Sequence, residues 1–126
     1  MTALAFSPEE VIGSRTLAAS VNTNPVVVRR LLLALRRARL IKTFTGRHGG
    51  ARLRKKPSRI SLVEIYDAIE SRPLIAVNER KALRRCHVSC TMKSIMSGVA
   101  ESTEEAVRKH LRGITLAQLV RKVQPR

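Results

Sequence analysis

The spacing of apolar residues predicts a short helix and a tight turn near the start of the chain. Leu17, Ala18 and Val21 fall on one face of a helix over residues 15–20, and we expect this face to point inward. Asn22 suits the turn that follows, because asparagine adopts the left-handed backbone conformation more readily than any residue except glycine. The chain is therefore expected to enter a second helix after only a few residues.

A longer helix is predicted from Pro25 to about Ala38. Asn24 supplies a capping side chain, and proline suits the first helical position because its φ is fixed and it has no N–H to leave unpaired. At 100° per residue, two faces separate on this helix. The inward face holds Val28, Leu31, Leu32 and Leu35, and the outward face holds Val26, Arg30, Leu33 and Arg37. Such a pair of helices is typical of a helix-turn-helix whose second helix enters the DNA major groove.

A β-hairpin is predicted directly after the second helix. Residues 40–45 alternate and contain β-formers, residues 46–50 form a glycine-rich turn, and residues 51–54 return along the first strand. Glycines permit positive φ and a close approach of the backbone to a phosphate. The cations of the hairpin are Arg47, His48 and Arg52. Coupled to a helix-turn-helix, this hairpin indicates the wing of a winged helix.

Three more helices are predicted in the second half of the chain. The first runs over residues 61–71, with a capping box of Ser61 and Glu64. The second runs from Cys86 or Cys90 to Leu111, and the third runs over residues 115–123. The inward residues of the first are Leu62, Ile65, Ala68 and Ile69, and those of the third are Leu116, Leu119 and Val120.

The helical tail has no domain of its own to cover, which favours a dimer interface over packing back onto the winged domain. We therefore predict a mainly α fold: a winged helix-turn-helix with a two-stranded β wing and a C-terminal helical dimerisation tail. The expected division is a DNA-binding domain over residues 1–73 and a linker with a helical dimerisation region over residues 74–126.

The basic residues are concentrated in the middle of the chain. The formal net charge of the 126 residues is +16, and residues 11–63 contribute +13 because they hold thirteen Lys and Arg and no Asp or Glu. Residues 1–10 contribute −2 and residues 64–126 contribute +5. A field of one sign repels itself, and a polyanion that releases its counterions on binding relieves the repulsion. The charge therefore favours a nucleic acid as the partner.

The remaining composition narrows the partner and the protein class. The chain has only three aromatic residues, which argues against binding of RNA or single strands by base stacking, so double-stranded DNA is expected. The three histidines are scattered and no Ser or Cys has a recognisable base beside it, so we do not expect an enzyme. The longest apolar run, Leu31 to Leu35, is far below the roughly 20 residues of a membrane span. Two cysteines fit a reducing compartment, and a cytoplasmic protein without membrane contact is expected.

Several motifs follow one another in an order typical of one family. They are SRTLAASVNTNPVVVRRLL over residues 14–32, LRRA over 35–38, glycines at 46, 49 and 50, ISL over 60–62 and IYDAIE over 65–70. Over about residues 14–90 the chain resembles the Rrf-two family of winged-helix transcription regulators, which includes IscR, NsrR and CymR. The VNTNPVVVRR run is similar in particular to the YwnA-like branch, which has no iron–sulfur cluster.

The resemblance implies a homodimer that binds a palindromic operator, most often as a repressor. It places the helix from Pro25 to Ala38 in the major groove and the wing in the minor groove, with long C-terminal helices crossing at the dimer interface. It also implies a first helix of about fifteen to twenty residues before Ser14, of which only residues 1–7 could be the end. The first helix is therefore expected to be truncated, either because the start codon is misassigned or because this protein is a shortened, less stable relative. Arg39 stands where the family has a glycine in a left-handed turn, at a cost of about 1 kcal/mol.

The cysteines depart from the cluster-binding members of the family, which ligate iron with three cysteines. Only Cys86 and Cys90 are present, at a spacing that fits neither a [2Fe–2S] nor a [4Fe–4S] site, so no cofactor and no metal are expected. These two residues are candidates for redox chemistry, because the neighbouring cations can lower a thiol pKa. Those cations are Arg84, Arg85 and His87. A purely structural role for both thiols is the favoured alternative.

The expected DNA contacts divide into two groups. Residues near the start of the second helix would meet base edges or adjacent phosphates, and they are Asn24, Pro25, Val26, Val27, Arg29 and Arg30. Residues that would position the DNA backbone are Ser14, Arg47, His48 and Arg52. The late arginines of the helix, Arg36, Arg37 and Arg39, are expected to contact phosphates or solvent.

The leading hypothesis is a sequence-specific, dimeric DNA-binding transcriptional regulator that represses. One alternative is a thiol-based redox-sensing regulator of the same fold. Another is a dimerising modulator that does not bind an operator itself, because a shortened first helix would weaken the DNA-binding domain.

Overall fold

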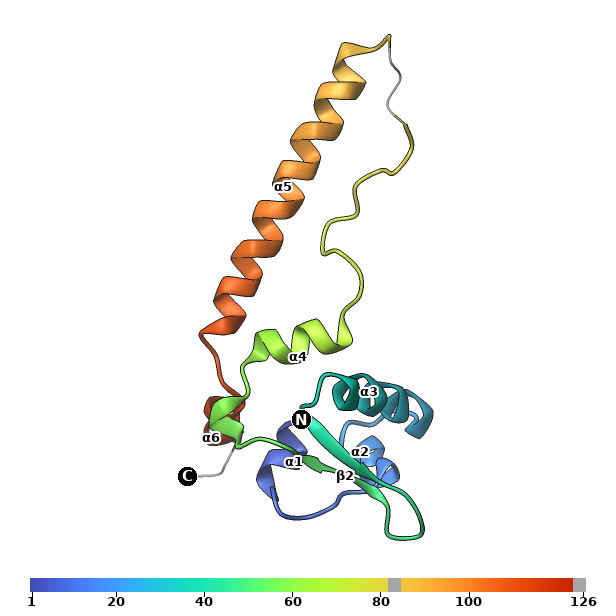
Figure 1. Cartoon of the computed structure of the whole chain (residues 1–126), viewed down its shortest axis with the longest axis vertical. Helices are drawn as coiled ribbons and strands as arrows, with labels where there is room; N and C mark the ends of the chain where they lie inside the picture. The colour runs from blue at the N-terminus through green and yellow to red at the C-terminus, as the bar shows by residue number, and fades with distance from the viewer. Residues whose placement is uncertain (82–84, 124–126) are drawn as a thin grey trace.

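The computed structural model describes residues 1–81 and 85–123, and it shows a winged domain from which one long helix extends (Figure 1). The helices are α1 (Thr2–Phe6), α2 (Ser14–Ser20), α3 (Pro25–Arg37), the 3₁₀ helix η1 (Pro57–Arg59), α4 (Leu62–Ile69), α5 (His87–Arg112) and α6 (Leu116–Val123), and the strands are β1 (Ile41–Phe44) and β2 (Gly50–Leu53). The mainly helical fold with a two-stranded antiparallel sheet confirms the predicted fold class.

Local signals set the turn between α2 and α3 as predicted. Asn22 takes φ +50°, and the N–H of Thr23 donates to the carbonyl of Ala18 at 2.9 Å, which closes α2. Asn24 then caps α3, because its side-chain oxygen accepts from the N–H of Val26 at 2.8 Å. Proline occupies the first turn of α3. The helix-turn-helix is therefore fixed largely by residues within a few positions of the turn.

The covered face of these helices is narrower than predicted. Leu17, Val28 and Leu35 are buried, but Val21 is 64% exposed and Leu31 is 41% exposed, so the prediction that both point inward was wrong. Both line an apolar groove of about 690 Å³ beside α1. The five residues of α1 cover only part of this face, which leaves the two side chains accessible.

The wing forms as the predicted short hairpin, and its second strand begins at Gly50, which the sequence placed in the turn. Ile41 pairs with Leu53 and Phe44 pairs with Gly50, and the turn contains Gly46 at φ +98°. A side chain at Gly49 would bring its Cβ within 2.4 Å of the carbonyl oxygen of Phe44, so this position admits only glycine without a backbone shift. The sequence between α3 and β1 contains Arg39 at φ +59°, as the resemblance implied for a position that usually holds glycine.

Helix α4 lies between α3 and α5 and connects the winged domain to the long helix. Ser61 and Glu64 form the predicted capping box. On the side facing α5, the hydroxyl of Tyr66 donates to Glu104 at 2.9 Å, and Arg108 makes a bidentate ion pair with Asp67. These polar contacts hold the C-terminal half of α5 against the domain.

The inward face predicted for α4 needs one correction. Ile69 is 46% exposed, whereas Val63, which lies off the predicted face, is buried. The reason is that neighbours approach α4 from two sides, so that burial does not follow a single stripe.

The two helices of the tail behave differently. Helix α6 packs against α1 and η1, where Leu116 is fully buried and Val120 is 9% exposed. Backbone hydrogen bonds join it to the domain, from Leu116 N–H to the carbonyl of Ile60 at 2.8 Å and from Leu62 N–H to the carbonyl of Ile114 at 2.9 Å. Helix α5 contains no buried residue and extends away from the domain (Figure 1). The last helix thus belongs to the winged core, whereas α5 leaves a face uncovered.

Glu64 gives the fold a measurable pH dependence. The hydrogen bond from Lys55 is the largest cause that lowers the pKa of Glu64 below its ordinary value of 4.5, and the N–H of Ser61 adds to the effect. A lowered pKa means that the carboxylate stabilises the fold above pH 4.5 and that this contribution disappears as the pH falls through the folded value. We expect Glu64→Gln to lose about 0.5 kcal/mol of unfolding free energy at pH 7 and nothing at pH 2. Urea unfolding at both pH values measures this, with the exposed Glu101→Gln as control, and an equal loss at both would contradict the assignment.

Candidate nucleic-acid interface

A groove of about 340 Å³ lies between α3, the wing and the start of α2. Its lining contains two arginines and no carboxylate, and its floor includes backbone of the glycine-rich turn. The lining residues are Ser14, Arg29, Leu32, Leu33, Arg36, Thr43, Phe44, Gly46, Gly49 and Gly50. Residues 11–63 contain no Asp or Glu. The helices and strands of this segment therefore supply no carboxylate that could neutralise the positive charge of the groove.

Side-chain hydrogen bonds orient the two arginines of the groove. The guanidinium of Arg29 donates to the hydroxyl of Ser14 at 3.4 Å, and that of Arg36 donates to the hydroxyl of Thr43 at 3.4 Å. The structure thus brings together Ser14 and Arg29, which the sequence predicts in different groups of contacts. The sequence predicts a phosphate or solvent contact for Arg36, and its place beside the wing depends on the fold of β1 against α3.

The outer face of α3 adjoins the groove and is open to solvent. Val26 is 56% exposed, and Arg30 and Arg37 are exposed as predicted. Val27 is 44% exposed, but at 100° per residue it lies on the flank of α3 away from Arg29 and the wing. The part of α3 that faces outward beside the groove therefore presents arginines and two apolar side chains, Val26 and Leu33, of which Leu33 is 38% exposed.

Two of the predicted contacts also have a structural role. The side-chain oxygen of Asn24 is engaged in the helix cap, and Pro25 starts the helix. The N-terminus of α3 points its positive end outward, which favours a phosphate there.

The cations of the wing occupy two positions. Arg47 and His48 are exposed at the tip, in the turn between β1 and β2. Arg52 lies in β2 opposite Lys42, and its guanidinium is 5.5 Å from the centroid of the Phe44 ring. Together with Lys42, Arg54, Lys55 and Lys56, it lines a second basic pocket of about 440 Å³ that also contains Glu9. Arg52 thus does not line the groove that holds Arg29, although it contacts Phe44, which does.

The cysteines lie at the far end of α5 from the winged domain (Figure 1). Cys86 caps α5 by accepting from the N–H of Ser89 at 3.4 Å, and the N–H of Cys90 donates to the carbonyl of Cys86 at 3.2 Å, one helical turn on. Arg84, one of the cations expected beside them, lies outside the described residues.

An iron–sulfur cluster takes four protein ligands, mostly cysteines. The chain has two cysteines, and within residues 1–81 and 85–123 no three His, Cys, Asp or Glu side chains gather as a possible metal site. The metal-ligating side chains in the described residues of one chain therefore do not fit an iron–sulfur cluster. In the same residues, no helix is both long and apolar enough to span a membrane.

Comparisons with known proteins agree with this geometry. Residues 1–122 match the model of the Rrf2 family, described as iron-dependent transcriptional regulators. The candidate HTH-type transcriptional regulator YwnA of Bacillus subtilis strain 168 is 36% identical over 116 residues, which are 91% of this chain and 86% of that protein. A solved structure of a candidate DNA-binding protein is 31% identical, with a TM-score of 0.72 and coverage of 94% of this chain and 97% of that one.

IscR of T. potens has the same fold, with a TM-score of 0.69 at 20% identity, and the match covers 98% of this chain and 79% of that one. The winged-helix prediction and the family resemblance are therefore confirmed. This chain belongs to the Rrf2 family of transcriptional regulators.

Proposed function

We propose that this protein is a sequence-specific regulator that binds a palindromic operator as a homodimer in the cytoplasm and represses transcription. The observation that carries the proposal is the carboxylate-free groove between α3 and the wing, with Arg29 and Arg36 held by Ser14 and Thr43. Membership of a family of transcriptional regulators supports this over an enzymatic role.

The shape of the surface suggests how duplex DNA would lie on it. The outer face of α3 would enter the major groove, where Arg30 can reach base edges bidentately and Val26 can contact a thymine methyl. A phosphate strand would then follow the groove between α3 and the wing, along Arg29 and Arg36. Arg47 and His48 at the tip would contact the backbone or the minor groove.

The uncovered face of α5 supports a dimer. Val88, Met92, Ile95 and Val99 recur at intervals of four, three and four residues, which is the spacing of a coiled-coil seam. Each of them is between 44% and 68% exposed in the single chain. We propose that a second copy of this chain covers the seam. Two identical seams can pair about a two-fold axis, and this symmetry would place two copies of α3 on the two halves of a palindrome. In this division, residues 1–73 and α6 form the DNA-binding unit, and α5 supplies the contact between copies.

Base reading and backbone positioning are expected to separate on mutation. Arg30→Ala should cost about 1–3 kcal/mol and relax the preference at one base pair per half-site. Arg47→Ala should weaken all duplexes equally and reduce the slope of log affinity against log salt by about 0.9 for each phosphate that the variant no longer neutralises. Sequencing of genomic fragments captured by the protein identifies the operator. Fluorescence polarisation with operator and scrambled duplexes at several salt concentrations then measures the affinities and the salt slope.

Two results of that measurement would oppose the proposal. A salt slope near zero for the unmodified protein would remove its electrostatic basis. A chain that dimerises but binds no duplex would favour the modulator that does not bind an operator itself.

We further propose that the protein works without an iron–sulfur cluster and that its thiols are structural, as the capping role of Cys86 supports. The purified protein should lack stoichiometric iron and visible absorbance, and peroxide treatment should leave operator affinity unchanged. A reversible loss of affinity that disappears in Cys86→Ser would instead establish the redox-sensing alternative. Ser94→Ala, an exposed position on the same helix, is the control.

A further inference from the structure

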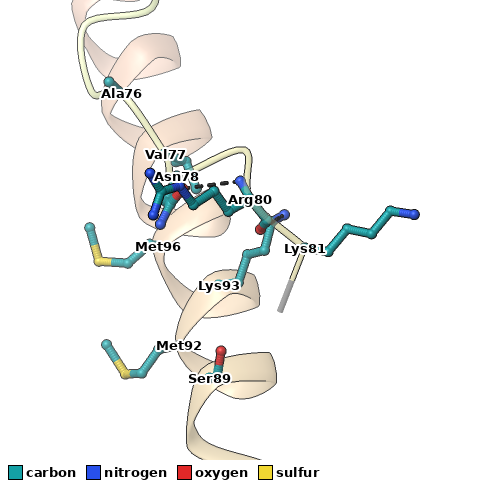
Figure 2. A pocket seen from close by; sticks show the side chains of 9 residues that line it. All are labelled: Ala76, Val77, Asn78, Arg80, Lys81, Ser89, Met92, Lys93 and Met96. Atoms are coloured by element: carbon teal, nitrogen blue, oxygen red, sulfur yellow. Dashed lines mark hydrogen bonds between the residues drawn. The ribbon is translucent and has the colours of Figure 1, made fainter. Parts of the chain in front are cut away.

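Another pocket, distinct from the grooves and the basic pocket of the winged domain, lies between α5 and the extended connection that precedes it, toward the end of α5 away from the wing (Figures 1 and 2). Its volume is about 300 Å³. The lining comes from two stretches, one of the connection and one of the first turns of α5. The residues are Ala76, Val77, Asn78, Arg80, Lys81, Ser89, Met92, Lys93 and Met96.

Hydrogen bonds hold the connection in place along the helix. The side-chain oxygen of Asn78 accepts from the N–H of Arg80 at 3.0 Å, which fixes the bend of the connection. The ammonium of Lys93 donates to the carbonyl oxygen of Arg80 at 3.0 Å, which ties that bend to α5 (Figure 2). The pocket is therefore shaped by contacts between its own lining residues.

The lining has two chemically distinct parts. Arg80, Lys81 and Lys93 are cationic and no carboxylate lies among the lining residues, so an anion is favoured. Met92 and Met96, one helical turn apart, contribute flexible and polarisable apolar surface, and they are 46% and 38% exposed. Figure 2 shows Lys81 extending away from the helix, so the cations of the lining that remain beside α5 are Arg80 and Lys93.

We propose that this pocket binds a small organic acid. Its carboxylate would be held by the guanidinium of Arg80 and by the N–H groups of the Lys93 ammonium that remain after its bond to the backbone. Its apolar body would lie on Met92 and Met96. A pocket of this volume is at the lower end for small-molecule sites, so it fits an acid with a compact aryl or short alkyl body and not a polymer.

The position of the methionines gives the ligand a route to regulation. Met92 belongs to the seam of α5 and Met96 borders it, so a body resting on both side chains would bias the packing of two copies of α5. This consequence for DNA binding rests on the proposed function, whereas ligand binding itself does not.

The test uses a panel of aryl and short alkyl carboxylates, each paired with its own primary amide, and the full-length protein. Saturation-transfer NMR and titration should show saturable binding of at least one carboxylate, with its neutral amide at least tenfold weaker. Arg80→Gln and Lys93→Gln should each weaken that carboxylate about tenfold. Lys109→Gln removes one exposed charge from the same helix outside the pocket and should leave binding unchanged.

Binding of no carboxylate in preference to its amide would overturn the proposal, and so would equal loss in Lys109→Gln and the two pocket variants. Circular dichroism of each variant verifies that a loss does not come from unfolding. The ligand titration contains no DNA, so its result is independent of operator binding. The protein could bind its operator without binding a carboxylate, or bind a carboxylate without binding an operator.

Discussion

Ile95→Glu is expected to convert the proposed dimer into folded monomers and to reduce operator affinity by about a hundredfold or more. The side chain is 50% exposed in the single chain, at the centre of the α5 seam, so the glutamate costs little within one copy. In the dimer, the same carboxylate would face its own symmetry mate in an apolar contact, where burial of an unpaired charge is strongly unfavourable. Two half-site contacts joined in one dimer exceed a single contact in affinity by about 10²–10⁴, and this gain is lost in the monomer.

Sedimentation and polarisation measured on the same preparation test this prediction. Ser94→Glu is the matched control, because it places the same charge one residue away, about 100° around α5 and off the seam, at an exposed position. It should remain dimeric and bind the operator normally. A dimeric Ile95→Glu, or a monomer with undiminished operator affinity, would refute the assignment of this seam.

Leu116→Ala is expected to destabilise the winged domain by about 2–5 kcal/mol, as is usual for a truncated buried leucine. Leu116 is fully buried, and its backbone N–H donates to the carbonyl of Ile60 in the same core. The total stability of a small domain is about 5–15 kcal/mol, so the loss should be visible as a large drop of the urea midpoint. Operator binding should fall at temperatures where the variant is partly unfolded.

Val123→Ala on the same helix is the control, because that side chain is 59% exposed. It should change the unfolding free energy by less than about 0.5 kcal/mol. If Leu116→Ala were equally harmless, α6 would not be part of the winged core. The urea slope should also stay constant, because the same surface is exposed on unfolding in both variants.

Much of the winged domain could be predicted because interactions between residues close in sequence determine its helix starts and turns. Asn24 and Pro25 fix the start of α3, Gly46 and Gly49 permit the wing turn, and Ser61 with Glu64 starts α4. Each of these signals acts through backbone atoms a few residues away, so its effect on local structure does not depend on the tertiary fold. The same holds for the charge of residues 11–63, which is a property of composition.

The sequence by itself thus determined the order of α2, α3, the wing and α4, the starts of α3 and α4, the family and the expectation of DNA as partner. It did not determine every boundary, because the helix predicted over residues 61–71 ends at Ile69 and Gly50, predicted in the turn, belongs to β2. Only the tertiary structure decided which apolar faces are covered. Periodicity shows that Val21 and Leu31 lie on apolar faces, but the short α1 leaves them exposed, and α6 returns to the domain while α5 does not. Likewise, contacts between distant segments bring Ser14 to Arg29 and Lys93 to Arg80. The physical reason is that burial depends on how long-range neighbours share the available surface, and no short stretch of sequence contains that information.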